Sequence, residues 1–108
     1  MTGVGSIALT PEQFAIVAAI LQGHLPGGSS LAVFGSRATG RARRFSDLDL
    51  IIDAGRGLSL DEAAALREAF SDSDLPWRVD VVDRWEIGEG FRAMIAADAV
   101  PLLVVPAR

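Results

Sequence analysis

The sequence predicts an α/β fold in which helices and strands alternate along a single domain spanning residues 1–108. Two observations support this prediction. Two segments begin with a helix-capping sequence and continue with apolar residues at helical spacing. Short apolar runs typical of buried strands lie at 31–34, 47–52, 77–83 and 101–105. The predicted order is therefore helix, strand, strand, helix, strand, helix and strand, with room for a short helix after the first strand.

The composition limits the kinds of site that the chain can build. Half of the residues are hydrophobic, 50%, which is enough for one compact core. The net charge of −4 argues against a general nucleic-acid binder, so we expect no direct nucleic-acid contact. The chain has no Cys and a single His, which excludes disulfides, thiolate metal sites and histidine clusters. Any metal site must therefore use oxygen ligands.

The N-terminal part carries no targeting or membrane signal. Residues 1–9 are uncharged and rich in small residues, and we expect them to be loosely held. No basic region precedes an apolar stretch, and the uncharged residues 13–36 are interrupted at 26–28 by Pro-Gly-Gly. We therefore expect no signal peptide and no membrane span, and a cytoplasmic location.

The first helix is predicted to begin after Thr10, which serves as N-cap, with Gln13 closing a capping box. It should end near Gly23, with His24 just beyond it as a cap rather than a catalytic group. One face of this helix is apolar and predicted to enter the core: Phe14, Val17, Ile20 and Leu21.

The later helices are also predicted from their capping residues and apolar faces. Ser59 and Glu62 form a second capping box, and the acidic residues 71–74 end that helix as a solvated cluster. A last helix is predicted over 84–97, with Asp83 as its cap. The buried face of the second helix is predicted to include Leu60, Ala63, Leu66 and Phe70, and Asp53, at the end of the second strand, is predicted to be solvated.

Residues 35–52 are the stretch that packing alone does not explain. An apolar strand stops at Gly35-Ser36, where a glycine allows close backbone approach to a ligand. The Ser36 hydroxyl lies beside N–H groups at the start of a helix, which is a natural seat for phosphate. Four of the ten basic residues crowd into the following loop, an excess that suits a polyphosphate: Arg37, Arg41, Arg43 and Arg44.

Two carboxylates follow on the next strand. In residues 47–52, strict alternation sends Asp47 and Asp49 to one face and the leucines to the other. Two like charges this close raise each other's pKa unless a cation lies between them. Oxygen ligands that leave room for water and phosphate suit Mg²⁺.

This pattern, GSRATGRARRFSDLDLII over residues 35–52, resembles the nucleotidyltransferase superfamily. More narrowly, it is similar to the minimal nucleotidyltransferases, the antitoxins of bacterial HEPN and nucleotidyltransferase toxin–antitoxin pairs, over about residue 9 to the end. The resemblance implies a small mixed β-sheet flanked by helices, with the Asp-x-Asp strand central. The competing interpretation is an ordinary hairpin with a glycine-rich turn and two solvated aspartates.

The resemblance also implies the site. Its third carboxylate, flanked by apolar residues on a later strand, matches Asp80, although an ion pair with Arg78 or Arg43 is a competing role for that residue. Catalytic and metal-holding residues would then be Asp47, Asp49 and Asp80, holding two Mg²⁺ ions, with ATP as donor. Nucleotide-binding residues would be Gly35, Ser36, Arg37 and Ser46.

The implied activity is transfer of AMP from ATP to a hydroxyl, a tyrosine of a partner HEPN toxin, by an antitoxin. A chain this short is expected to lack an acceptor domain, so a partner toxin, or another copy of the chain, should complete the site in an oligomer. Two alternatives stay open: a non-catalytic antitoxin that neutralises by binding alone, and a nucleotidyltransferase acting on a small molecule.

Overall fold

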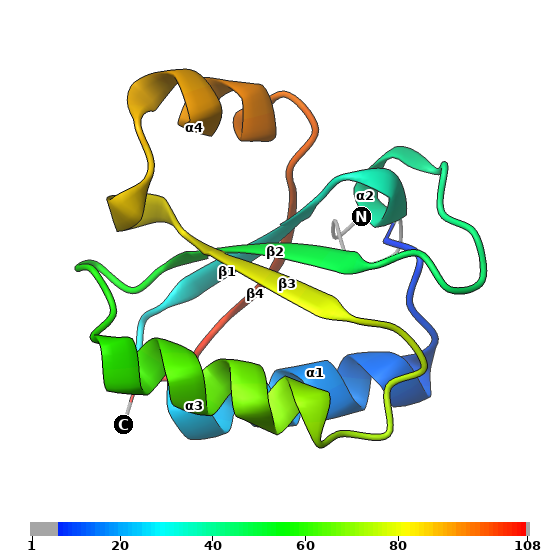
Figure 1. Cartoon of the computed structure of the whole chain (residues 1–108), viewed down its shortest axis with the longest axis horizontal. Helices are drawn as coiled ribbons and strands as arrows, with labels where there is room; N and C mark the ends of the chain where they lie inside the picture. The colour runs from blue at the N-terminus through cyan, green and yellow to red at the C-terminus, as the bar shows by residue number, and fades with distance from the viewer. Residues whose placement is uncertain (1–6, 108) are drawn as a thin grey trace.

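A four-stranded mixed sheet forms the centre of the computed structural model, which describes residues 7–107 (Figure 1). The strand order is β3-β2-β1-β4, in which β1 pairs antiparallel with β2 and β4, and β2 pairs parallel with β3. This confirms the small mixed sheet and the internal position of the Asp-x-Asp strand. The strands are β1 (Ser30–Phe34), β2 (Leu48–Asp53), β3 (Val79–Asp83) and β4 (Val100–Val104).

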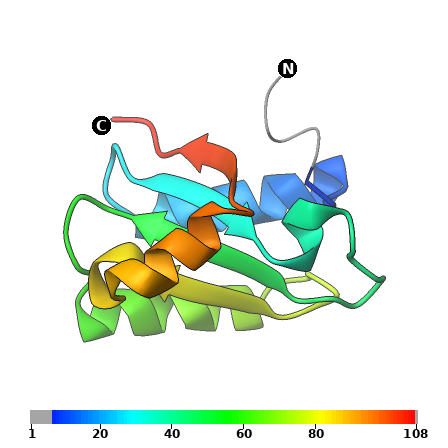
Figure 2. The same ribbon diagram turned by 90° about the horizontal axis from the view of Figure 1, so that it is seen from above.

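The helices are divided between the two faces of the sheet. The long helices α1 (Pro11–His24) and α3 (Leu60–Ser71) lie side by side on one face, whereas α4 (Glu89–Ala96) lies over the other (Figures 1 and 2). The single-turn α2 (Ser36–Thr39) follows β1 directly. One end of the second face therefore has no long helix packed on it.

Alternating burial along β2 determines which side chains reach that second face. Leu48, Leu50 and Ile52 are fully buried, and they belong to the same core as Val17 of α1 and Leu66 of α3. The residues between them, including Asp49, are only half-buried. The predicted alternation is thus confirmed, and it directs the acidic face of β2 away from the two long helices.

Both predicted capping boxes are present. The Thr10 side chain accepts from the N–H of Gln13 and the Gln13 side chain accepts from that of Thr10, at 3.1 and 3.0 Å. Ser59 and Glu62 make the equivalent pair of bonds at the start of α3. His24 is the last residue of α1 rather than a residue beyond it, and its side chain is exposed.

Three expectations about the helices and strands were wrong in detail. The helix predicted over 84–97 is two pieces, the 3₁₀ helix η2 (Arg84–Glu86) and α4, because Gly88 is extended at φ −77° and ψ 168°. The strand predicted over 77–83 begins at Val79. Leu60 is 88% exposed because it is the first residue of α3, ahead of the turn that meets the core.

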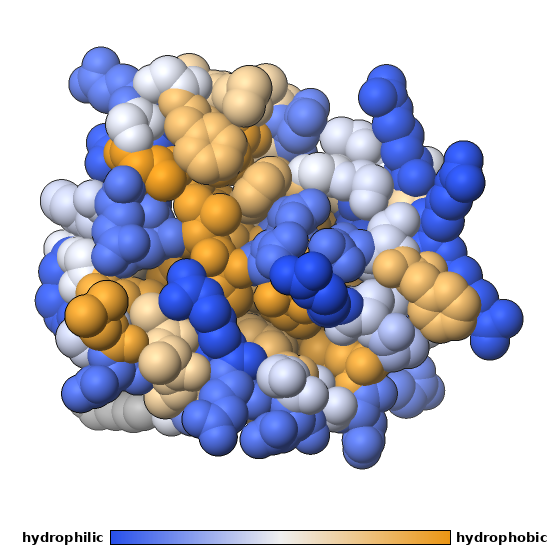
Figure 3. Space-filling model, viewed as in Figure 1, coloured by the Kyte–Doolittle hydropathy of each residue, from blue (hydrophilic) through white to orange (hydrophobic). Residues whose placement is uncertain are grey.

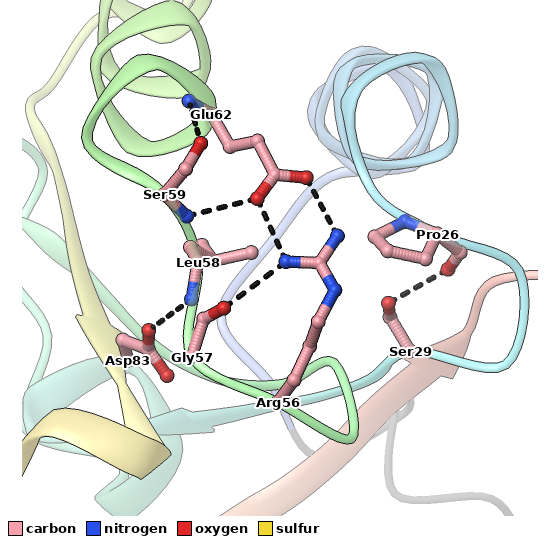
Figure 4. A network of polar contacts seen from close by, with 8 residues as sticks. All are labelled: Pro26, Ser29, Arg56, Gly57, Leu58, Ser59, Glu62 and Asp83. Carbon is pink, nitrogen blue, oxygen red and sulfur yellow. Dashed lines mark hydrogen bonds and ion pairs between the residues drawn. The ribbon is translucent and has the colours of Figure 1, made fainter.

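The loop between β2 and α3 is held by a polar network (Figure 4). Arg56 donates two bonds to Glu62, both at 2.8 Å, and one to the carbonyl of Gly57. Asp83 is buried and accepts from the N–H of Leu58 at 2.7 Å and from that of Trp85 at 2.9 Å. Asp83 is therefore the cap that the sequence predicted, although of η2, and it also fixes the entry to α3.

Asp53 is not simply solvated, as the sequence had suggested. It is half-buried and accepts from the indole Nε1–H of Trp85 at 2.8 Å and from the N–H of Gly55 at 2.9 Å. These two bonds, the Trp85 bond first, hold the pKa of Asp53 below its ordinary value. Asp53 thus ties the end of β2 to η2.

The chain is also held before α1. Ile7 is buried in the core, and the N–H of Ala8 donates to the carbonyl of Arg37 at 3.0 Å, so residues 7–9 are not loose. Residues 1–6, the rest of the segment expected to be loosely held, lie outside the described residues. Across residues 7–107, none of the helices combines the length and apolar character needed to cross a bilayer.

Candidate active site

The turn after β1 passes directly over a carboxylate of β2. Gly35 has φ +72° and ψ −156°, a region that residues with a side chain rarely adopt. A Cβ at this position would collide with Oδ2 of Asp49 and lie 3.3 Å from its Cγ. The carbonyl of Gly35 then accepts from the N–H groups of Ala38 and Thr39, which forms the first turn of α2. Glycine is therefore required here by backbone conformation and by space.

Two further carboxylates lie near Asp49. Asp49 is the register partner of Asp80 across the parallel β2–β3 pair, so the two side chains share one face of the sheet. Asp47 precedes Asp49 by two residues and acts on it electrostatically. Burial first, then the negative charge of Asp80 and that of Asp47, raise the pKa of Asp49 above its ordinary value.

The donor set suits a hard divalent cation. Carboxylate oxygens are the ligands that Mg²⁺ prefers, and a cation beside Asp49 would offset the burial and the repulsion that together raise the pKa of Asp49. Within residues 7–107, no three acidic, His or Cys side chains converge closely enough to hold an ion by themselves. Mg²⁺ usually keeps several water or phosphate ligands, so a partial set of carboxylates fits it.

The ion pair proposed as a competing role for Asp80 is present but weak. Nη2 of Arg78 lies 3.5 Å from Oδ1 of Asp80, and the two side chains are 80% and 47% exposed. An exposed pair at this distance contributes little to stability. Among the described residues, the cation within ion-pair distance of Asp80 is thus Arg78, not Arg43.

A hollow of about 910 Å³ along β3 makes Asp49 and Asp80 accessible to a ligand. Its lining includes Asp49 and Asp80 together with the apolar side chains of Phe34, Val82 and Phe91. Figure 3 shows hydrophobic side chains in a band that runs from α4 toward the middle of this side of the molecule, between hydrophilic patches. The hollow therefore has an acidic wall, formed by the two aspartates, next to an apolar wall.

A second hollow, of about 510 Å³, lies between α4 and the strands β1 and β2. Its lining is mainly apolar and includes Ala32, Ile51 and Ile95, with Asp53 and Arg92 among its polar residues. None of the predicted catalytic or nucleotide-binding residues lines it. Asp49 and Asp80 line the hollow along β3, whereas Asp47 and the predicted nucleotide-binding residues do not, so we place the candidate active site where that hollow meets Asp49 beside the turn at Gly35.

The predicted nucleotide-binding residues divide into two groups. Gly35 and Ser36 form the turn beside Asp49. Ser46 and Arg37 instead hold the loop that leads to β2: the Ser46 hydroxyl accepts from the N–H of Arg43 at 2.8 Å, and the Ser46 carbonyl accepts from Nε of Arg37 at 3.0 Å. The structure thus places Gly35 against Asp49 and Asp80 beside Asp49, with Asp47 near enough to act on Asp49 electrostatically, but it gives Arg37 and Ser46 partners within the protein.

Arg37 differs from the other arginines of the loop. Its side chain is buried, whereas Arg41, Arg43 and Arg44 are exposed. Burial lowers the pKa of the guanidinium from its ordinary value, and the nearby charge of Asp47 opposes that shift. Two of its neighbours, Ala8 and Trp77, had not been predicted to lie near the site, because no local pattern marks contacts between distant segments.

Comparisons with known proteins identify the family of the chain. The model of the nucleotidyltransferase domain family matches residues 16–103. A protein of Haemophilus influenzae named "Probable protein adenylyltransferase MntA" is 44% identical over 95 residues, which cover 88% of this chain and 82% of that protein.

Solved structures show the same fold. A toxin–antitoxin complex crystallised with AMP-PNP superposes with a TM-score of 0.73 at 22% identity, over 84% of this chain and 73% of that one. A candidate minimal nucleotidyltransferase superposes with a TM-score of 0.64 at 31% identity, over 83% of this chain and 89% of that one. By its family match and its sequence identity to a relative of similar length, this chain belongs to the nucleotidyltransferase domain family.

Proposed function

We propose that this chain is a Mg²⁺-dependent protein adenylyltransferase that transfers AMP from ATP to a hydroxyl of a partner toxin and so acts as its antitoxin. The observation that carries the proposal is the placement of Asp49 beside Asp80 in strand register, with the backbone of Gly35 against the Asp49 carboxylate. The relative named as an adenylyltransferase and the toxin–antitoxin neighbour with AMP-PNP support it.

The carboxylates of Asp47, Asp49 and Asp80 would hold the metal, most simply as two Mg²⁺ ions. When bound, Mg²⁺ would offset the negative charge on the phosphates and favour the ionised form of the attacking hydroxyl. Burial and the charges of Asp80 and Asp47 disfavour the charged form of Asp49, which supports a site built for a cation.

The protein itself would position the phosphates and the acceptor hydroxyl for the transfer. The turn at Gly35 and Ser36 would bind the β- and γ-phosphates through backbone N–H groups and the Ser36 hydroxyl. The acceptor oxygen forms a bond to the α-phosphorus, the bond from that phosphorus to the β-phosphate oxygen breaks, and pyrophosphate leaves. Asp80 would accept the proton of the acceptor hydroxyl. The exposed arginines 41, 43 and 44 would steer the nucleotide.

The acceptor is proposed to be a tyrosine of a helical HEPN-type toxin. The hollow along β3 offers an apolar wall next to the acidic one, which suits an aromatic side chain that ends in a hydroxyl. The cytoplasmic location predicted from the sequence stays a prediction.

Neutralisation by binding alone is a second candidate, and one observation favours it. Trp85, Phe91 and Met94, on η2 and α4, are 50%, 41% and 66% exposed. Phe91 and Met94 lie three residues apart on α4, and exposed apolar side chains at this spacing are typical of a helix surface that binds another protein. Such a surface would serve a stoichiometric inhibitor as well as an enzyme that must dock its substrate.

Co-expression with the product of the neighbouring gene distinguishes the two candidates. If the chain is an enzyme, intact-mass analysis will show one or more AMP increments on the partner, and Asp80→Asn will remove them while the proteins still associate. Asp74→Asn, an exposed acidic residue outside the site, is the matched control and should keep the increments. A partner that stays unmodified, yet is fully neutralised by wild type and Asp80→Asn alike, would establish binding as the mechanism.

A further inference from the structure

The guanidinium of Arg37 is surrounded by backbone carbonyls. Nε donates to Ser46 at 3.0 Å, Nη1 to Ala8 at 2.8 Å and Nη2 to Arg44 at 3.3 Å. The side chain is only 5% exposed. Three donors on one rigid plane therefore bind two positions of the loop after α2 and one position of the N-terminal segment.

The same guanidinium stacks on an aromatic ring. Cζ of Arg37 lies 4.3 Å from the centroid of the Trp77 ring, and Trp77 is itself 8% exposed. Trp77 lies shortly before β3, the strand that carries Asp80. Burying a cation is costly unless it is hydrogen-bonded and stacked, and here the carbonyls and the ring supply both kinds of partner.

These contacts connect the phosphate-binding turn of the proposed site to the loop that leads to Asp47. Arg37 directly follows Ser36 of the phosphate-binding turn, and one of its carbonyl partners belongs to Ser46, which directly precedes Asp47. The bonds to Ser46 and Arg44 therefore set where the loop delivers Asp47 relative to that turn. The bond to Ala8 and the stack on Trp77 hold the guanidinium itself in place.

We propose that Arg37 is a positioning residue, which holds the Asp47 loop against the phosphate-binding turn and does not itself contact the nucleotide. The inference rests on the proposed function. It replaces the direct nucleotide contact expected from the sequence, because a guanidinium that turned toward phosphate would leave three carbonyls without their donor. Lysine cannot reproduce the arrangement, since its ammonium is not planar and cannot donate in a fixed fork.

The test compares Arg37→Lys with Arg56→Lys. Arg56 also binds through a two-pronged contact, but with Glu62 on the surface of the β2–α3 loop, so it controls for the loss of a guanidinium fork. ATP binding to the chain alone is followed by Trp77 fluorescence in a Trp85→Phe background, once with Mg²⁺ and once with EDTA. This readout needs no acceptor and no transfer.

A positioning role predicts that Arg37→Lys binds ATP in EDTA as the parent does but loses most of the gain in affinity that Mg²⁺ provides, because Asp47 is displaced. In the transfer assay, which contains Mg²⁺, kcat should fall about 10- to 100-fold, as expected for a misplaced catalytic group, and the KM for ATP should rise only as far as the lost Mg²⁺ gain accounts for. Trp77 emission should also shift, whereas Arg56→Lys should match the parent in every readout.

Three results would overturn the inference. Weaker ATP binding in EDTA, or a raised KM with unchanged kcat, would mean that Arg37 contacts the triphosphate. Parental behaviour of Arg37→Lys in all assays would mean that the fork is not needed. Loss of folding in both Arg37→Lys and Arg37→Gln would reduce Arg37 to a folding residue. Absence of transfer by the wild type would instead contradict the proposed function, and the Mg²⁺ dependence of ATP binding would still test Arg37.

Discussion

The backbone of Gly35 lies so close to the Asp49 carboxylate that position 35 has no room for a side chain. The contact joins the end of β1 to the neighbouring strand β2, whose register pairs Phe34 with Asp49. It brings the proposed phosphate-binding turn and the proposed metal ligand together without any intervening side chain. Substitution at position 35 should therefore disturb the two together.

Gly35→Ala should abolish transfer and destabilise the fold. The backbone conformation of Gly35, at positive φ and extended ψ, is adopted almost only by glycine and costs an alanine about 1–3 kcal/mol, and the added Cβ would push Asp49 away. Gly28→Ala is the matched control, because Gly28 has φ +88° but open space around its Cα. Urea unfolding and nucleotide transfer should show both variants destabilised but only Gly35→Ala inactive. Full transfer by Gly35→Ala would contradict the proposed site.

Ser36→Ala should have a smaller effect than Gly35→Ala. It removes one hydroxyl from the proposed phosphate seat but leaves the backbone of the turn in place. Calorimetric titration with ATP and Mg²⁺ should show weakened binding with an unchanged unfolding temperature. Unchanged affinity in both Ser36→Ala and Gly35→Ala would argue against a phosphate seat at this turn.

Asp49→Asn should separate stability from activity. Burial and the neighbouring carboxylates of Asp80 and Asp47 disfavour the charged form of Asp49, so an uncharged amide should leave the metal-free protein at least as stable as the wild type. Transfer should nevertheless be lost, because a carboxylate ligand is gone. Thermal unfolding in EDTA and incorporation of labelled nucleotide measure the two effects. A wild-type rate in Asp49→Asn, or in the double variant Asp47→Ala, Asp49→Ala, would refute metal-assisted transfer.

Asp83→Ala should destabilise the protein by about 1–3 kcal/mol, the cost of leaving buried N–H groups without an acceptor. The two groups are the N–H of Leu58 at the entry to α3 and that of Trp85 in η2. Asp72→Ala, an exposed residue, is the control. Chemical unfolding should show a loss for Asp83→Ala alone, and equal stabilities would contradict the role of Asp83 as a cap.

The β2–α3 network predicts a contribution to stability that depends on pH. The bond from Arg56, followed by that from the N–H of Ser59, lowers the pKa of Glu62 from its ordinary value of 4.5 to about 2. Because the pKa is lower in the folded protein, the stabilisation is present above about pH 4.5 and is lost as the pH falls toward 2. Glu62→Gln should therefore unfold at lower denaturant concentration at pH 7 and show a shallower acid dependence. Parallel acid-unfolding curves would show that the ion pair adds nothing, and high salt should reduce the difference since the pair is exposed.

Much of the fold was predictable because its signals are local. A capping box is completed within four residues, as at Thr10 and Gln13, and α1 begins directly after Thr10, as predicted. Alternation along β2 is a property of the strand alone, so Asp49 could be assigned to the face away from the long helices before the neighbours of β2 were known. The errors arose where a local pattern lacked its packing context. Leu60 fits an apolar helical face in the sequence, but it lies before the first turn that reaches the core.

The sequence by itself determined the helices, the strands and the acidic face, and with them the family resemblance. Only the tertiary structure decided which residues meet: that Asp80 lies beside Asp49, that Gly35 touches a carboxylate, and that Arg37 is buried rather than exposed to the nucleotide. The bond from Arg37 to Ala8 spans 29 residues of chain. Such a contact depends on how the sheet and the N-terminal segment pack together, which the periodicity of either segment does not encode.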